Sequence, residues 1–231
     1  MPKKKKSNLL KWLLILTLIL VIIFSFANSC QTTTVGYNNL GQVVKYNYSH
    51  YSNPEIKIAV VSGMHSRESL HQLVLPEVCK VLALFNNVEV VNYKVQVTSN
   101  PEDFDIGRSN GESLVHDYVV SDVAKSNYDL VIIGHDHESD YGEGYYIATP
   151  SMDDSSVSLA NKVTNSLSNF NYYKRDTSVS AKSTSINSVD NPIVSTGTKL
   201  FVYEIPEDDF APFAFINSYR LIYDSYKILS S

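Results

Sequence analysis

The pattern of hydrophobic and polar positions divides the chain into an apolar N-terminal stretch and a longer alternating part. Between Trp12 and Phe24 the chain is almost wholly apolar. From Ile56 onward, short apolar runs alternate with segments whose apolar residues recur at helical spacing. Short apolar runs predict buried strands, and the spaced segments predict amphipathic helices. The alternation therefore predicts a single α/β domain with a mixed, mostly parallel sheet and helices on both faces.

Each element is predicted from its own local pattern. The apolar runs predict strands at residues 56–61, 88–97, 130–133, 145–148 and 199–205. Helical spacing predicts helices at residues 67–85, 112–125, 153–167 and 212–229. Residues 106–111 and the Ser/Thr-rich residues 177–190 are predicted to be loops.

Residues 1–30 form a separate unit ahead of this domain. The basic cluster Lys3–Lys6 followed by an apolar run is typical of a signal peptide or an uncleaved membrane anchor. Because basic flanks stay on the cytoplasmic side, the rest of the chain is expected outside the cell membrane, either anchored or secreted. Cys30 follows small residues, which also suits a lipid anchor. The polar residues 31–53 predict a tether or a lead-in strand, and residues 54–231 are predicted to form the globular domain.

Composition limits the function classes. The chain has 231 residues, of which 44% are hydrophobic and 19% charged, so it can bury a substantial core. Its net charge of −5 argues against nucleic acid as a partner, because nucleic-acid-binding domains usually carry a basic face. Cys79 is the only cysteine of the predicted domain, so no disulfide is expected within it.

Candidate metal ligands follow two of the predicted strands. His65 and Glu68 come three residues apart after the strand at 56–61, and His135 follows the strand at 130–133. In a parallel sheet, ligands collect beyond the carboxyl ends of the strands, where these residues are expected to meet. Two imidazoles and one carboxylate make a three-ligand zinc site with a fourth position open for water. Such a site predicts that residues 54–231 form a metallohydrolase-like domain and that the protein is a zinc-dependent hydrolase.

Three segments resemble motifs of one enzyme family. The segment from Ser62 to Glu68 is similar to a His-x-x-Glu pair after a strand. The segments 129–135 and 198–206 are similar to an Asp-Leu-x-x-x-x-His strand end and to a late Glu-bearing strand. In this order they resemble the zinc carboxypeptidase superfamily, which includes carboxypeptidase A-like enzymes and the succinylglutamate desuccinylase/aspartoacylase group. The resemblance implies zinc held by His65, Glu68 and His135, with Glu204 as the catalytic residue of an amide-cleaving metallopeptidase.

Further residues are candidates for catalysis and substrate binding. Glu204 shares one face of its predicted strand with apolar residues. A carboxylate on such a face has a raised pKa and can act as a general base. Arg108 lies between the second and third ligands in sequence and can clamp a substrate carboxylate or stabilise an oxyanion. His137 can bind substrate or replace His135 as a ligand. Asp136 or Glu138 can orient a ligating imidazole.

Several alternatives stay open. The chain has no Asn-Arg pair, which the peptidase branch uses to bind the terminal carboxylate, so an N-acyl amino acid is an alternative substrate to a peptide. Residues 134–137 also resemble the Gly-His-x-His of calcineurin-like metallophosphoesterases. A non-catalytic, membrane-tethered surface domain with a closed four-ligand zinc site, His137 included, is the remaining alternative.

Overall fold

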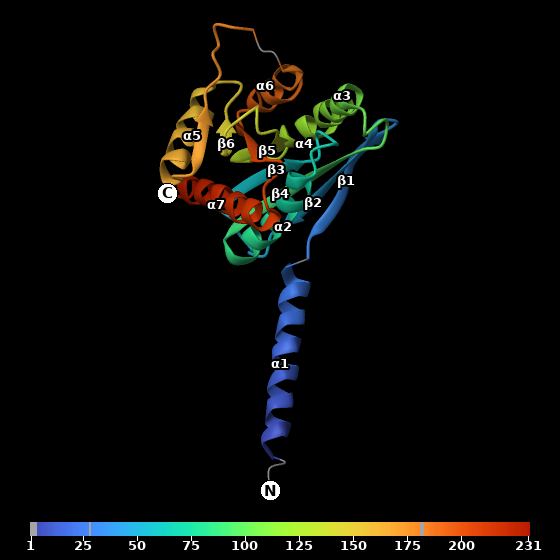
Figure 1. Cartoon of the computed structure of the whole chain (residues 1–231), viewed down its shortest axis with the longest axis vertical. Helices are drawn as coiled ribbons and strands as arrows, with labels where there is room; N and C mark the ends of the chain where they lie inside the picture. The colour runs from blue at the N-terminus through green and yellow to red at the C-terminus, as the bar shows by residue number, and fades with distance from the viewer. Residues whose placement is uncertain (1–3, 28, 181–182) are drawn as a thin grey trace.

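One eight-stranded sheet organises the computed structural model, which describes residues 4–27, 29–180 and 183–231 (Figure 1). The strand order is β1-β2-β4-β3-β5-β8-β6-β7. The four central strands β4, β3, β5 and β8 are parallel. The β1–β2, β2–β4 and β6–β8 pairs are antiparallel, and the β6–β7 pair is parallel. The prediction of a mixed, mostly parallel sheet is confirmed.

The strands and helices have the following bounds. The strands are β1 (Gln31–Asn38), β2 (Gly41–Tyr48), β3 (Ile56–Ser62), β4 (Val88–Val97), β5 (Leu130–His137), β6 (Tyr145–Ala148), β7 (Phe170–Tyr173) and β8 (Lys199–Pro206). The α-helices are α1 (Lys4–Ala27), α2 (Leu70–Phe85), α3 (Phe104–Leu114), α4 (Ser121–Val123), α5 (Asp154–Ser166), α6 (Asn191–Val194) and α7 (Ala211–Leu229), and the π-helical turns are η1 (Val115–Val120) and η2 (Ile186–Asp190).

Both faces of the sheet are covered, because alternate residues of the central strands point to opposite sides. In β5, Leu130 and Ile132 join one core with α2, α5 and α7. Val131 and Ile133 join the other core with α3, η1, η2 and α6. Continuous apolar strands of this kind are what a sheet buried on both faces requires, and the helices on both faces confirm the predicted architecture.

Some elements differ from the sequence-based expectations. Residues 31–48, expected to be a tether, form β1 and β2, and β2 pairs along its whole length with β4. Residues 106–111, expected to be a loop, lie inside α3. The expected loop 177–190 ends in η2. In each case a polar or glycine-containing segment gains order from pairing with the sheet or packing on its face rather than from its own hydrophobic pattern.

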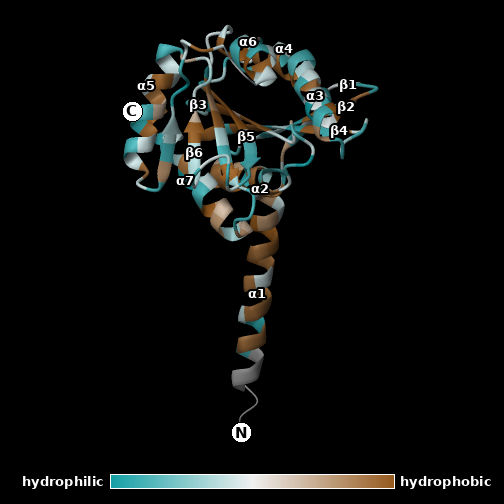
Figure 2. Cartoon of the chain, turned by 45° about the horizontal axis from the view of Figure 1, so that its top comes forward, coloured by the Kyte–Doolittle hydropathy of each residue, from teal (hydrophilic) through white to brown (hydrophobic). Residues whose placement is uncertain are grey.

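The helix α1 projects from the domain and is apolar along its length (Figures 1 and 2). Its segment Asn8–Phe26 is long and apolar enough to cross a membrane, and none of that segment is buried. Residues 1–3 and Asn28 lie outside the described residues, so the structure describes the predicted basic cluster and the segment before Cys30 only in part. The helix ends at Ala27, and β1 follows from Gln31, so the anchor candidate leads almost directly into the sheet.

Candidate metal centre

The β3–α2 connection and the end of β5 supply the candidate ligands. β3 ends at Ser62, and Gly63 turns the chain with a φ of +82°, a value that favours glycine. His65 and Glu68 follow in this connection before α2 begins at Leu70. His135 lies near the carboxyl end of β5, the strand that pairs directly with β3. The sheet therefore brings together residues that are about seventy positions apart in sequence.

The three predicted ligands converge on one point. Glu68 Oε1 lies 2.7 Å from Nδ1 of His65, and Glu68 Oε2 lies 2.9 Å from Nδ1 of His135. The two imidazole rings are 4.4 Å apart between centroids. One ligand atom from each residue lies within 4.8 Å of the other two. Both histidines are buried, so their positions are fixed by packing.

Charge explains how these groups coexist at close range. Burial alone would raise the pKa of Glu68, but the imidazoles of His135 and His65 outweigh it and hold that pKa well below its usual range. Burial would lower the pKa of His135, but the Glu68 carboxylate raises it to about 9. A proton on the His135 imidazole thus balances the carboxylate charge where a divalent ion would otherwise do so.

The donor set fits a divalent metal ion. A tetrahedral zinc ion with ligands at about 2.1 Å has ligand atoms about 3.4 Å apart. One donor atom from each residue lies within 4.8 Å of the other two, so the side chains would have to move up to about 1.4 Å closer together to hold such an ion. Two imidazole nitrogens and one carboxylate oxygen leave room for further coordination, as catalytic sites require.

Glu204 lies next to this group on the neighbouring strand. It pairs directly with His135 in the parallel β5–β8 register, so both side chains point to the same face of the sheet, with backbones about 4.8 Å apart. Among the described residues no hydrogen bond or ion pair involves the Glu204 carboxylate. Burial raises the pKa of Glu204; the His135 imidazole opposes this rise and Glu68 adds to it. The carboxylate is therefore free to exchange a proton near the metal ligands.

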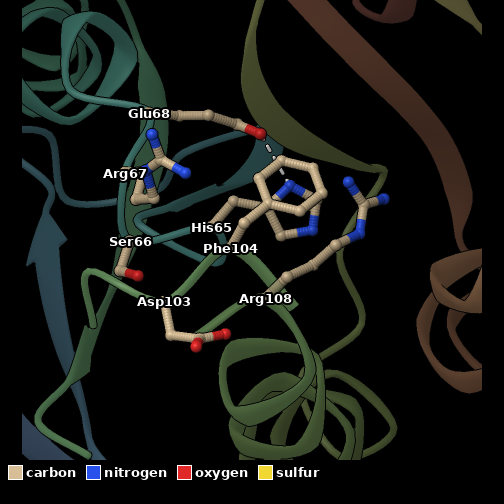
Figure 3. A pocket seen from close by; sticks show the side chains of 7 residues that line it. All are labelled: His65, Ser66, Arg67, Glu68, Asp103, Phe104 and Arg108. Carbon is tan, nitrogen blue, oxygen red and sulfur yellow. Dashed lines mark hydrogen bonds and ion pairs between the residues drawn. The ribbon is translucent and has the colours of Figure 1, made fainter. Parts of the chain in front are cut away.

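Arg108 lines the same pocket as the candidate ligands His65 and Glu68. Figure 3 shows the pocket, which is lined by His65, Ser66, Arg67, Glu68, Asp103, Phe104 and Arg108. The Arg108 side chain is about one third exposed, and its Nε donates to Glu112 Oε1 at 3.2 Å. Its terminal nitrogen donates to Ser183 Oγ at 3.3 Å. These contacts hold a guanidinium at the rim, within reach of an anionic group in the pocket.

His137 does not join the group. Its Nδ1 lies 3.0 Å from the carbonyl oxygen of Glu138, and its Nε2 lies 2.9 Å from that of Gly144. The ring packs 5.1 Å from that of Tyr146, between centroids. A role in substrate binding or as a fourth ligand would require this buried ring to leave both carbonyls.

Two buried acids near the centre were not singled out from the sequence. Glu112 Oε1 lies 3.6 Å from Nε2 of His65, on the side of the ring that faces away from Glu68, and Thr184 donates to Glu112 Oε2. Asp190 is 1% exposed, and its Oδ1 has no hydrogen-bond partner. Burial raises the pKa of Asp190 to about 7; the nearby His135 opposes this rise and Glu112 adds to it. These two acids could not be identified from the sequence, because each lies in a helix or π-helical turn and is buried by packing that the local sequence does not reveal.

Solved structures with a similar fold are metallopeptidases. A metallo-carboxypeptidase from Pseudomonas aeruginosa, in complex with (2-guanidinoethylmercapto)succinic acid, is 12% identical, with a TM-score of 0.58 over 90% of this chain and 66% of that chain. A metallo-carboxypeptidase from Burkholderia cenocepacia is 11% identical, with a TM-score of 0.55 over 88% of this chain and 65% of that one. The chain has the zinc carboxypeptidase fold.

A third similar structure matches in length as well. It is a provisionally assigned metallopeptidase from Shewanella denitrificans OS217, 13% identical, with a TM-score of 0.55 over 89% of this chain and 86% of that chain. By contrast, the chain spans about two thirds of the length of the two carboxypeptidases. No protein-family model matches the chain, and no curated protein matches its sequence. At these identities the likeness is one of fold, so the chemistry follows from the site residues.

Proposed function

We propose that this protein is a zinc-dependent hydrolase that cleaves an amide bond of a peptide outside the cell membrane. One observation carries the proposal: His65, Glu68 and His135 converge at the carboxyl ends of β3 and β5, with Glu204 beside them on β8. The zinc carboxypeptidase fold supports the same reaction class. We assign His65, Glu68 and His135 as metal ligands and Glu204 as the catalytic residue.

The side chains divide the chemistry among them. When bound, zinc supplies a Lewis acid that lowers the pKa of a water toward about 7 and polarises a carbonyl. Glu204 has no hydrogen-bond or ion-pair partner among the described residues, so its carboxylate can take a proton from the attacking water and return it to the leaving nitrogen. Its raised pKa suits both steps, because a carboxyl group whose pKa lies closer to the working pH can both accept and return a proton. Arg108 binds the substrate carboxylate or the developing oxyanion.

The proposed location follows from how α1 meets the sheet. β1 pairs with β2, and β2 with β4, so that Gln31 at the start of β1 lies level with Asn47, Val91 and, through β4, Ala59. The metal centre lies beyond the carboxyl ends of the parallel strands. From Ala59 to the end of β3 at Ser62 is about 10 Å along the strand. A membrane-anchored α1 would hold the domain close to the bilayer with the pocket facing the aqueous phase, where peptides are accessible.

The metallophosphoesterase alternative lacks support from this geometry. It needs His135 and His137 as neighbouring ligands, whereas both ring nitrogens of His137 face backbone carbonyls. The closed four-ligand site of a non-catalytic domain needs the same change in His137. A deacylase would use the same site residues as the proposed peptidase, so only the substrate distinguishes these two hypotheses.

Hydrolysis assays on the purified full-length chain in detergent test the proposal. We expect zinc-loaded wild type to cleave peptides with a free terminal carboxylate faster than N-acetyl amino acids, and chelation to abolish the activity. Glu204→Gln should lower kcat by about 10²–10⁴-fold while zinc binding is kept. Glu55→Gln, the same change at an exposed position just before β3 and away from the metal centre, is the control and should leave kcat within about twofold. Absence of hydrolysis of both substrate classes by zinc-loaded wild type would refute the proposal.

A further inference from the structure

Two segments far apart in sequence must stay aligned for the metal centre to exist. His65 and Glu68 belong to the β3–α2 connection, whereas His135 belongs to β5. Backbone pairing between β3 and β5 ends at Val61 and Ile133, before any of the ligands. The ligands therefore need another connection between the two segments beyond the end of the ladder.

Asp136 provides a direct connection to the start of α2. Its Oδ2 accepts a hydrogen bond from the amide of Leu70 at 2.6 Å, and its Oδ1 accepts one from the amide of His71 at 2.8 Å. These amides belong to the first turn of α2, where no helical carbonyl is available to them. Ser69, at the N-cap position, makes no side-chain hydrogen bond to cap the helix. A carboxylate from β5 thus replaces the local cap and also meets the positive end of the helix dipole.

Asp136 also reaches both ends of the ligand-bearing connection. Its backbone amide donates to Glu68 Oε2 at 3.1 Å. Its Oδ1 lies 3.2 Å from Nδ1 of His71, and Nε2 of the same ring accepts a hydrogen bond from the amide of Gly63 at 3.0 Å. His71 is fully buried, so its ring is a fixed spacer between Asp136 and Gly63. The connection is held at Gly63, at Glu68 and at the start of α2 by one residue of β5.

Strand geometry explains how His135 can be a metal ligand while the next residue, Asp136, contacts α2. Successive side chains of a strand point to opposite faces. His135 shares its face with Val131 and Ile133, whereas Asp136 faces the side on which α2 packs. We propose that Asp136, with His71, is a positioning pair that sets the distance between His135 and the ligands of the β3–α2 connection. This inference rests on the proposed metal site. It assigns Asp136 and His71 a positioning role that is separate from metal ligation and from proton transfer.

The test compares zinc affinity in two aspartate-to-asparagine variants of the full-length chain in detergent. Asp136→Asn replaces one acceptor oxygen by an NH₂ group, so one of the two α2 amides loses its partner. Asp153→Asn is the matched control, because Asp153 caps α5 by accepting from the amide of Ser156 at 2.9 Å and lies outside the metal centre. Asp153 caps with its Oδ1 alone, so Asp153→Asn keeps the cap and controls for the loss of a negative charge at a helix N-terminus.

We expect Asp136→Asn to raise the zinc dissociation constant about 10–100-fold, as loss of an outer partner of a metal ligand typically does. Asp153→Asn should leave the zinc dissociation constant within about twofold and change Tm only slightly, because asparagine caps a helix about as well as aspartate. The absorption spectrum of the cobalt-substituted protein should change in Asp136→Asn and stay that of wild type in Asp153→Asn. Zinc binding by wild type together with an unchanged affinity in Asp136→Asn would overturn this inference alone. Failure of wild type to bind zinc would overturn it together with the proposed function.

A measurement on wild type covers the case in which Asp136→Asn does not fold. In metal-free protein, the amides of Leu70 and His71 should exchange with deuterium as slowly as amides in the middle of α2, because Asp136 holds them without a metal. Rapid exchange at both amides, with slow exchange restored only by zinc, would show that the metal aligns the segments and that Asp136 does not.

Discussion

At the scale of single residues, the balance of charge around His135 governs the metal-free site. Burial lowers the pKa of this imidazole, but the negative charges of Glu68, Glu204 and Asp190 outweigh burial and raise that pKa to about 9. A metal ligand must be deprotonated, so zinc has to displace this proton. The positive charge of a bound ion would then take the place of the imidazolium among the same acids.

Asp190 gives a residue-scale prediction about stability and pH. In metal-free protein its pKa is raised to about 7 by burial, whereas an unfolded aspartate titrates near 3.8. Between these two values the folded state binds more protons than the unfolded state, so the contribution of Asp190 to stability falls as pH rises. Asp190→Asn removes this effect. The stability of the variant relative to wild type should therefore increase from pH 4 to pH 8, by at most about 4 kcal/mol.

Urea unfolding of both chelated proteins across this pH range measures the difference. Because all other titrating groups are shared, their contributions cancel in the comparison. A difference in unfolding free energy that stays constant with pH would show that Asp190 is ionised at the same pH in folded and unfolded protein.

The sequence predicts the ligand residues better than the residues around them. His65, Glu68 and His135 stand out because each follows an apolar strand, and the carboxyl ends of parallel strands meet. Glu112 and Asp190 do not stand out, because each lies in a helical segment and reaches the centre only through packing. Their involvement depends on contacts between residues about fifty or more positions apart, which no local pattern encodes.

At the scale of elements, helix α3 packs directly against the β3–α2 connection, and a glycine lies at the point of contact. A Cβ atom placed on Gly111 would lie 1.6 Å from the backbone oxygen of Met64, the residue before His65. The helix can approach this closely only where no side chain intervenes. The glycines of this segment suggested a loop in the sequence, but in the structure they allow close packing of a helix.

Gly111→Ala therefore tests how α3 supports the centre. In a free helix this change is favourable by about 1 kcal/mol, because alanine has the higher helix propensity. Here we expect the opposite: a loss of about 3 kcal/mol in unfolding free energy and weaker zinc binding, because α3 or the connection at Met64 must shift. Ser109→Ala, at an exposed position of the same helix, should change stability by no more than about 0.5 kcal/mol. Stabilisation by Gly111→Ala would contradict the close packing.

At the scale of the whole molecule, hydrophobic alternation predicted the architecture and missed its edges. The central strands are recognisable because they are apolar on both faces, which a sheet between two helical layers requires. The edge strands β1 and β7 are largely exposed and polar, so their strand character comes from pairing with neighbours. This is why residues 31–53 suggested a tether although β1 and β2 extend the sheet.

The central claim is that one ion is held jointly by His65, Glu68 and His135. Its most direct test is the zinc content of the purified full-length chain in detergent, measured for wild type beside Glu68→Gln and His135→Ala. Wild type should hold about one zinc ion per chain, and both variants should hold almost none while keeping the circular dichroism of the folded protein. Equal zinc in all three proteins, or none in folded wild type supplied with zinc, would contradict the account.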